Sequence, residues 1–336
     1  MKIFLFRFFL AVLAAIVAFP AAAATHTASF AGRSDVQAFI AEMHEKHGFD
    51  SAALARAFAQ AKPIPAVIRA IQPPRDPAIR SWQNYRARYV EPRRIALGLR
   101  FWDEHRTELA AARSRSGVPE EIIVAIIGVE TIYGHHTGNY STFAALATLA
   151  FDYPPRAALF RSELEELLLL ARETGRDPLS FKGSYAGAIG LPQFLPSSVR
   201  RYAVNGSGND RIDLGASPAD AIASVANFLK EHGWEANGPI AVAAHVEGER
   251  FAALIDEGIN PQRKTSELHA WGVVADGAPD QPAALIDLVS PQQPMEYRLG
   301  YRNFYVLTRY NRSSFYAMAV HDLGQTLRAE REASDH

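Results

Sequence analysis

One acidic side chain in this sequence stands where its charge would be costly. Glu130 lies near the end of AIIGVETIYG, residues 125–134, and its neighbours Ile126, Ile127 and Val129 offer little solvation. Apolar surroundings and the negative end of a helix dipole both favour the neutral acid, so we expect a raised pKa for Glu130. A carboxyl group that keeps its proton near neutral pH suits a general acid that protonates a leaving-group oxygen. The motif leaves open a Glu130 that simply faces outward or pairs with an arginine.

A helix is expected to position this acid. Pro119 suits the first turn, two glutamates follow it near the positive end of the dipole, and Gly134 suits a left-handed C-terminal end. The pattern predicts a helix from about Pro119 to Tyr133, with Glu130 in its last turn or just before it.

Two adjacent histidines, His135 and His136, follow this helix and raise the question of a metal site. The HExxH pattern of zinc proteases is absent, and neighbouring residues that leave a helix point in different directions. We therefore expect loop histidines that face solvent, and no catalytic zinc.

Four stretches form an ordered set along the chain: GVPEEIIVAIIGVETIYG, SYAGAIGLPQFLPSSVRRYAV, DAIASVANFLKEHGW and NFYVLTRYNRSSFYAMAVHDLG. In that order they resemble the catalytic-helix signature, the second signature, the segment that follows it and the closing motif of one family. This family is the MltB-type lytic murein transglycosylases, glycoside hydrolase family 103. The stretches keep the family's order from about Trp82 to Gly324, so the resemblance covers most of the chain and is more specific than any single motif.

The resemblance implies a mainly α, α+β fold. It would have a lysozyme-like helical core with a substrate groove, a helical N-terminal region and a small α+β portion. It also implies cleavage of the bond between N-acetylmuramic acid and N-acetylglucosamine in peptidoglycan strands, with no cofactor required. Glu130 would protonate the glycosidic oxygen and then, as a base, accept the proton of the muramoyl C6 hydroxyl while that oxygen attacks C1. The product would carry a 1,6-anhydro ring, and no water would enter it.

Seven polar residues match the family's groove, and their hydroxyl, amide and guanidinium groups are suited to bind sugars. Five lie in the second and closing signatures, and two match less closely: Ser184, Gln193, Tyr310, Asn311 and Tyr316, then Tyr85 and Arg156. Without the resemblance, the favoured interpretation is Gln193 as a turn-capping amide, Tyr310 as a strand aromatic and Arg156 as a surface charge. Phe228 stands where the family often has Tyr, which would remove a hydroxyl contact.

A single acid departs from ordinary glycosidases, which place two carboxylates across the bond. The acids nearest to Glu130 in the sequence are Glu120, Glu121 and Asp152, and the first two lie about three turns away on the same helix. The sequence shows no second catalytic carboxylate next to Glu130. It leaves open that folding brings an acid from elsewhere in the chain close to Glu130. In the family the substrate's own N-acetyl group is thought to take the place of the second acid.

The segment NGSGNDRIDLGASPAD lies where related enzymes carry a calcium loop similar to an EF-hand. The oxygen ligands would come from Asn205, Ser207, Asn209, the Arg211 carbonyl, Asp213 and Asp220. Amides occupy the first and fifth positions, Asp210 replaces the expected glycine, and no bidentate Glu closes the loop. A structural calcium ion and a polar loop without an ion are both open.

The first residues have the pattern of a secretory signal peptide. Lys2 and Arg7 precede an apolar stretch over 8–19, and small residues after Pro20 favour cleavage after Ala24. An uncleaved membrane anchor is the alternative. The sequence contains no cysteine, so disulfides and the usual bacterial lipid attachment are ruled out. We expect a periplasmic enzyme exported by its signal peptide, and not a lipoprotein.

Composition bounds the partners. The 336 residues, 48% hydrophobic and 21% charged, describe a globular chain. A formal net charge of -1 gives no argument for a nucleic-acid partner. We expect peptidoglycan glycan strands as the partner, a monomeric chain, and contacts with proteins of cell-wall synthesis or division.

Four parts are expected along the chain: a signal peptide over 1–24, a helical region over 25–115, a lysozyme-like catalytic core over 116–238 and a small α+β region over 239–330. In the last part, AALIDLV and NFYVLTRY are rich in branched and aromatic residues and predict strands. SPQQPMEYRLGY between them is too rich in Pro and Gly to predict a regular element.

Two other functions fit parts of the sequence. A lysozyme-type peptidoglycan hydrolase would use the same acid together with a positioned water. A non-catalytic wall-binding module would keep the aromatic and amide residues without depending on Glu130.

Overall fold

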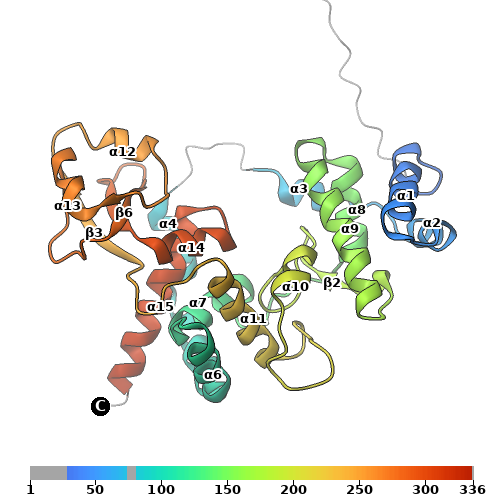
Figure 1. Ribbon diagram of the computed structural model, residues 1–336, viewed down its shortest axis with the longest axis horizontal. Helices are drawn as coiled ribbons and strands as arrows, with labels where there is room; N and C mark the ends of the chain where they lie inside the picture. The colour runs from blue at the N-terminus through green and yellow to red at the C-terminus, as the bar shows by residue number, and fades with distance from the viewer. Residues whose placement is uncertain (1–28, 74–80, 335–336) are drawn as a thin grey trace, which may run out of the picture.

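Helices make up most of the chain in the computed structural model, which describes residues 29–73 and 81–334 (Figure 1). Within those ranges the strands form one five-stranded and one two-stranded sheet. The expected signal peptide lies outside the described residues. The mainly α, α+β class predicted from the sequence is confirmed.

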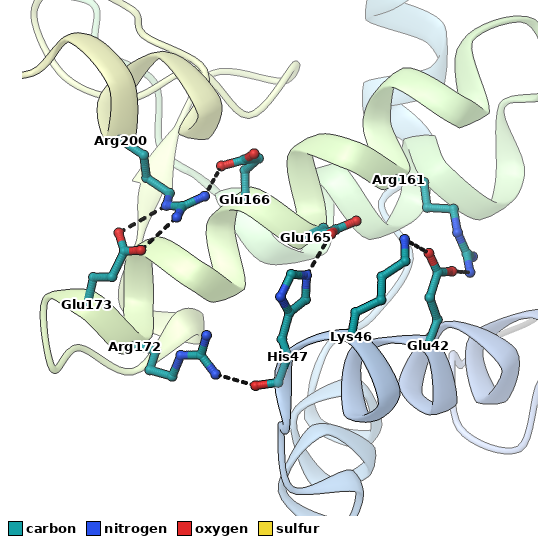
Figure 2. Close-up of polar contacts among 9 residues, drawn as sticks. All are labelled: Glu42, Lys46, His47, Arg161, Glu165, Glu166, Arg172, Glu173 and Arg200. Carbon is teal, nitrogen blue, oxygen red and sulfur yellow. Dashed lines mark hydrogen bonds and ion pairs between the residues drawn. The ribbon is translucent and has the colours of Figure 1, made fainter.

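The N-terminal helices pack on two later ones. The five are α1 (Ser34–His47), α2 (Ser51–Gln60), α3 (Pro65–Ile71), α8 (Thr142–Asp152) and α9 (Ala157–Glu173). Gly48, in a left-handed conformation, ends α1, and Pro65 opens α3 at its first turn. Phe39 and Phe58 bury their rings with Phe143 of α8 in a shared apolar cluster. Polar contacts also join α1 and α9 across this junction, since the His47 ring hydrogen-bonds Glu165 and the Arg172 guanidinium donates to the His47 carbonyl (Figure 2).

A second group of helices forms the larger core. It consists of α4 (Trp82–Tyr89), α5 (Pro92–Glu104), α6 (Arg106–Ser116), α7 (Glu120–Thr131), α10 (Pro196–Tyr202), α11 (Pro218–Glu231), α14 (Arg302–Tyr310) and α15 (Ser314–Ser334). Helix α7 is apolar on every side, as expected of a helix at the centre of a core. It contacts α5, α6, α11 and α15, so four neighbours fix its position.

The C-terminal third contributes an antiparallel sheet with strand order β4-β6-β7-β3-β5 (Figure 1). Its strands are β3 (Ala241–Val246), β4 (Arg263–Lys264), β5 (Val273–Val274), β6 (Pro282–Leu288) and β7 (Glu296–Gly300). Short helices α12 (Ala252–Asp256) and α13 (Thr265–Leu268) accompany it, and α12 packs on β6. The two-stranded sheet pairs β1 (Tyr140–Ser141) with β2 (Lys182–Gly183).

Three short 3₁₀ helices complete the regular elements of the described chain. They are η2 (Pro154–Arg156), η3 (Pro178–Ser180) and η4 (His269–Trp271). Proline opens the first two, where its fixed φ suits a tight turn.

One strand prediction is confirmed and two predictions of element type are wrong. AALIDLV forms β6 as expected. NFYVLTRY is the helix α14, because its buried residues Phe304, Leu307 and Thr308 recur at helical spacing and tertiary packing overrides the preference of aromatic residues for strands. The stretch expected to be irregular contains β7, which follows its Pro-rich half and pairs with both β3 and β6.

The two large apolar clusters do not follow the expected boundaries at 115 and 238. Helices α1 to α3 pack on α8 and α9 from within 116–238, whereas α15, from the end of the chain, packs on α7, α4 and α5. The four-part division stays a prediction. Among the described residues, no helix is long and apolar enough to cross a membrane.

Candidate active site

The helix that carries Glu130 ends abruptly. Helix α7 spans Glu120–Thr131, and the next two residues, Ile132 and Tyr133, take left-handed φ angles of 51° and 56°. The predicted end at Gly134 is therefore wrong, since the left-handed turn begins two residues earlier at a β-branched side chain. Such a conformation is costly for isoleucine and persists only where surrounding packing imposes it.

Tyr133 supplies that packing. Its ring lies against Gly98 of α5 and Gly128 of α7, where an added Cβ would come within 2.3 and 2.4 Å of the hydroxyl. The two glycines thus let the ring enter between the helices. The chain leaves α7 directly after Thr131, and Glu130 stands in the last turn, partly buried, as predicted.

Within residues 29–73 and 81–334, Glu130 has one side-chain hydrogen-bond partner, a tyrosine from the last helix. The hydroxyl of Tyr316, at 2% exposure, donates a hydrogen bond of 2.6 Å to Glu130 Oε1. Helix α15 packs along α7, which brings the two side chains together. The alternative of an outward-facing or arginine-paired Glu130 is not what the geometry gives.

Burial raises the pKa of Glu130 to about 7, and the Tyr316 hydrogen bond partly offsets this because it favours the ionised form. No charged residue adds to these two causes. Burial, and then the charge of Glu130, also raise the pKa of Tyr316 well above its usual value, so its hydroxyl stays a donor. The pair can release a proton near neutral pH and stabilise the resulting anion.

Tyr310 lies over Tyr316, with nearly parallel rings whose centroids are 6.2 Å apart. Its hydroxyl donates to the Pro192 carbonyl at 2.6 Å, and the ring of Phe228 lies 4.8 Å away. Phe228 is buried among these rings. Because this residue is Phe, it offers no hydroxyl here, as the sequence indicates. Tyr310 belongs to a helix, which corrects its reading as a strand aromatic.

Tyr85 joins this group from α4. Its ring packs on Phe315, the residue before Tyr316, and on Tyr89. Burial is the main cause that raises the pKa of Tyr85, and the charge of Glu130 is among the others. Tyr85, Tyr310 and Tyr316 therefore surround the acid.

Ser184 and Gln193 lie on a loop over 184–194, in which Ser184 N donates to the Ala188 carbonyl and Ile189 bridges Phe194. Ser184 Oγ accepts from Ala188 N at 3.1 Å. Gln193, with a left-handed φ of 50°, donates from Nε2 to the carbonyls of Thr137 and Gly190 at 3.1 and 3.0 Å. Gln193 thus acts as a turn-bracing amide, and Tyr310 ties the same loop to α14 through Pro192.

Two of the seven expected groove residues make no hydrogen bond or ring contact with this group in the described part of the chain. Asn311 is exposed at the C-terminal end of α14, four residues before the aromatic pair of α15 begins at Phe315. Arg156 is exposed in η2, with its guanidinium 5.2 Å from the ring centroid of Phe160. The reading of Arg156 as a surface charge agrees with this placement.

Sequence reasoning missed Thr131, which is fully buried next to the acid. Its hydroxyl lies 3.0 Å from the Leu191 carbonyl and accepts from Gly134 N at 3.0 Å. It therefore ties the end of α7 to the 184–194 loop. A polar residue directly after Glu130 in an apolar run was the available signal.

The two histidines considered as metal ligands, His135 and His136, do not belong to a cluster of ligating side chains in the described residues. His135 and His136 are exposed, and no three His, Cys, Asp or Glu side chains in residues 29–73 and 81–334 are grouped to hold an ion.

The six residues named for calcium form a loop held by its own hydrogen bonds. Asp220 accepts from the backbone N–H groups of Gly206, Ser207 and Asp213 at 2.8–2.9 Å, which occupies both carboxylate oxygens. Asn205 Oδ1 accepts from Gly208 N at 2.7 Å, and Asp213 Oδ1 accepts from Gly215 and Ala216. The other three residues of the expected ligand set, Ser207, Asn209 and Arg211, lie in the same loop. In this arrangement Asp220, Asn205 Oδ1 and Asp213 Oδ1 already accept from backbone amides, so the loop closes through its own hydrogen bonds and the donor set fits calcium poorly.

Comparisons with known proteins agree with one another. A family model described as the transglycosylase SLT domain matches residues 31–325. The membrane-bound lytic murein transglycosylase B of Escherichia coli is 41% identical over 317 residues, which are 90% of this chain and 85% of that protein. The crystal structure of soluble lytic transglycosylase SltB1 from Pseudomonas aeruginosa is 43% identical and has a TM-score of 0.82, covering 89% of this chain and 99% of that one. The Escherichia coli lytic transglycosylase Slt35 in complex with calcium is 40% identical with a TM-score of 0.79, covering 90% and 95%.

These matches extend over the core, the N-terminal helices and the α+β region alike, and they confirm the lysozyme-like fold that the sequence predicted. The chain belongs to the transglycosylase SLT domain family, among the MltB-type lytic murein transglycosylases, which are enzymes that act on peptidoglycan.

Proposed function

We propose that this enzyme cleaves the β-1,4 bond between N-acetylmuramic acid and N-acetylglucosamine without water, and leaves 1,6-anhydro ends. The observation that carries the proposal is the pair formed by Glu130 and Tyr316. A carboxyl with a pKa of about 7 can act first as an acid and then as a base at neutral pH.

In the first step Glu130 transfers its proton to the glycosidic oxygen while the bond from C1 to that oxygen breaks. The bonding electrons leave with the oxygen, which becomes the free 4-hydroxyl of N-acetylglucosamine. Glu130 becomes a carboxylate, and the Tyr316 hydroxyl stabilises it through the 2.6 Å hydrogen bond.

In the second step the Glu130 carboxylate takes the proton of the muramoyl C6 hydroxyl as that oxygen bonds to C1. The 1,6-anhydro ring closes and Glu130 regains its proton. The step needs neither an oxidant nor water, and the acid is ready for another cycle.

A single carboxylate suits this route better than hydrolysis. A hydrolase of the paired-acid type needs a second carboxylate across the bond, and no such charge acts on Glu130 in the described chain. The substrate's N-acetyl group is the candidate to support the electron-poor C1 centre.

The remaining groove residues have supporting roles in this proposal. Tyr85 and Tyr310 present rings for sugar faces, and Tyr316 positions the acid. Ser184, Gln193 and Asn311 offer hydroxyl and amide groups to sugar substituents, and Arg156 is assigned to the edge of the groove.

We further propose that the enzyme works in the periplasm after export by its signal peptide, as a monomer. Glycan strands are its substrate, and proteins of cell-wall synthesis or division are its neighbours there. We also propose the domain division over 25–115, 116–238 and 239–330. In this division α1 to α3, from the first part, pack on α8 and α9 of the second.

Mass spectrometry of the products from purified sacculi tests the reaction. The expected muropeptides end in a 1,6-anhydro ring and are one water lighter than those made by a lysozyme. Reducing ends in their place would establish the hydrolase alternative. Clearing of murein by Glu130→Gln at the wild-type rate would remove Glu130 from its role.

A further inference from the structure

A buried cation, Arg94, lies close to the end of α7 that carries the acid. It belongs to the first turn of α5, and its side chain leaves the residue only 6% exposed. Burying a guanidinium is costly unless its donors find acceptors, and apolar side chains often pack helices together at less cost. The contacts of Arg94 indicate what an apolar side chain could not provide here.

The guanidinium of Arg94 binds carbonyl groups of two other helices. Its Nε donates a hydrogen bond of 3.0 Å to the carbonyl of Gly128 in α7. Its Nη1 donates to the carbonyl of Arg88 in α4. Because the guanidinium is planar, its donors have fixed directions, and the two carbonyls are bound together only in one mutual arrangement. Arg94 therefore couples the ends of α4 and α7.

The Gly128 carbonyl belongs to the turn that ends α7. It also accepts from the backbone N–H of Ile132, at 3.1 Å, and Ile132 is the first residue in the left-handed conformation. The Tyr133 ring lies against Gly128 as well. Arg94 and Tyr133 thus enclose the same end of the helix, and Glu130 follows the bound carbonyl by two residues.

On its other side, Arg94 holds the part of α4 that carries Tyr85. The guanidinium carbon lies 5.2 Å from the centroid of the Tyr89 ring, and the Tyr89 and Tyr85 rings pack with centroids 4.8 Å apart. Tyr85 is one of the three tyrosines around Glu130. The side chain of Glu91 fixes Arg94 in turn, because its Oε1 accepts from Arg94 N at 2.7 Å and lies 3.8 Å from Nη1.

The charge of Arg94 does not act directly on the titration of Glu130. Within the described chain, burial raises the pKa of Glu130 and the Tyr316 hydrogen bond lowers it, and no cation is among the causes. Burial is the larger cause, and it depends on how closely the neighbouring helices cover the end of α7. Arg94 therefore influences the acid through the position of these helices.

Resting on the function proposed above, we propose that Arg94 is a positioning residue for Glu130. By binding the carbonyls of Gly128 and Arg88, it keeps α4 closed against the end of α7 and keeps water from the carboxyl group. Arg94 contacts no substrate in this role.

Position and charge have opposite effects on the acid, which makes the proposal testable. If α4 moves away and water reaches Glu130, desolvation decreases and its pKa falls toward 4.5. If Arg94 acted through its positive charge, removal of that charge would favour the neutral acid and raise the pKa. The alkaline limb of the pH profile of kcat follows this pKa, because Glu130 must hold a proton to act as the acid.

Two variants of Arg94 and one control carry the test. Arg94→Met removes the charge and the donors, whereas Arg94→Lys keeps the charge and loses the planar guanidinium. Arg302→Met is the matched control, since Arg302 donates to the carbonyls of Gly233 and His232 at 3.4 and 3.2 Å. Its guanidinium also lies over a tyrosine ring, at 5.6 Å from the centroid, and it stands at the start of α14.

Cleavage of purified sacculi is measured over a pH series, well below the Tm of each variant. Both Arg94 variants are expected to lower kcat about tenfold, the effect of one lost hydrogen bond. Their alkaline limb moves to lower pH by about one pH unit. Arg302→Met is expected to lower the Tm and to keep the kcat and the limb of the wild type.

Three outcomes would overturn the proposal. The first is an alkaline limb of Arg94→Met that moves to higher pH or stays in place. The second is a wild-type profile in Arg94→Lys, because the charge alone would then be sufficient. The third is an equal shift in Arg302→Met, because loss of any carbonyl-binding arginine would then have the same effect. Arg94→Lys decides the question alone if Arg94→Met does not fold.

Failure of the proposed function has a different signature, because wild-type enzyme then releases no anhydro products. NMR titration of the Glu130 carboxyl carbon, in protein with isotope-labelled glutamate, still decides the inference without any substrate. The signal is identified by its loss in Glu130→Gln. Equal titration midpoints in wild type and Arg94→Lys would refute the positioning role.

Discussion

Tyr316 and Glu130 are separated by 186 residues in the chain, yet the tyrosine hydroxyl lies 2.6 Å from the glutamate Oε1. The hydrogen bond stabilises the carboxylate, while burial among tyrosines and apolar side chains favours the neutral acid. These opposed effects leave the pKa near 7, where both forms are accessible.

Glu130→Gln is expected to lower kcat at least 100-fold, since general acid–base catalysis contributes on the order of 10²–10⁴. Turnover of purified sacculi measures this. Glu121→Gln is the matched control, because Glu121 is a partly buried glutamate at the other end of the same helix and is likewise raised in pKa by burial. A Glu121 variant as inactive as the Glu130 variant would mean that the helix, and not the acid, was damaged.

The same substitution is expected to change stability in a pH-dependent way. The pKa of Glu130 rises from 4.5 to about 7 on folding, so the folded state holds the proton more tightly and the free energy of unfolding falls as pH rises through this interval. Glu130→Gln removes that loss. The free energy of unfolding of the variant minus that of the wild type is therefore expected to be about 1–3 kcal/mol larger at pH 8 than at pH 4. Urea unfolding at the two pH values measures the change, and a difference that stays constant with pH would contradict it.

Tyr316→Phe is expected to raise the pKa of Glu130 further, since the hydrogen bond that favours the anion is lost. The alkaline limb of the pH profile of kcat then moves to higher pH, and kcat at its optimum falls about tenfold. Tyr301→Phe provides the control, because Tyr301 is also buried and hydrogen-bonded but lies in the α+β region. An unchanged pH profile for Tyr316→Phe would contradict the claim that the Tyr316 hydroxyl lowers the pKa of Glu130.

Thr131→Val is expected to destabilise the protein by about 1–3 kcal/mol, because it leaves the Leu191 carbonyl and the Gly134 amide without their partner. It also lowers kcat by loosening the 184–194 loop against α7. Thr142→Val is the matched change, since Thr142 is buried but its hydroxyl has no hydrogen-bond partner. Thermal unfolding of both variants checks the prediction, which fails if the two lose the same stability.

A chelator is expected to leave the Tm unchanged, because Asp220 already closes the 205–220 loop through three backbone amides. Asp220→Ala is expected to cost about 1–3 kcal/mol whether or not calcium is added. Asp210→Ala, at an exposed position of the same loop, is the comparison. A Tm that rises with calcium and falls with chelator would show that the loop binds a structural calcium ion.

Local patterns in the sequence were enough to place Glu130 near a helix end with a raised pKa, because apolar neighbours and helix-end residues act within a few positions. They could not place Tyr316 beside it, because that contact depends on how α15 packs along α7. The strand predicted at NFYVLTRY failed for the same reason, since burial against α11 and α15 selected the helical period over the preference of its aromatic residues. The helix end at Ile132 was also hidden, because it depends on Tyr133 entering a space left by Gly98 and Gly128.

The position of Tyr316 in the last helix sets an order on the making of the enzyme. A chain that emerges from its N-terminus has Glu130 long before it has α15, so the growing polypeptide carries an acid without its hydrogen-bond donor. The same holds for a product truncated before Ser314, which would lack the whole of α15. The hydrogen-bonded pair of Glu130 and Tyr316 therefore forms only after α15 has been made and has packed along α7.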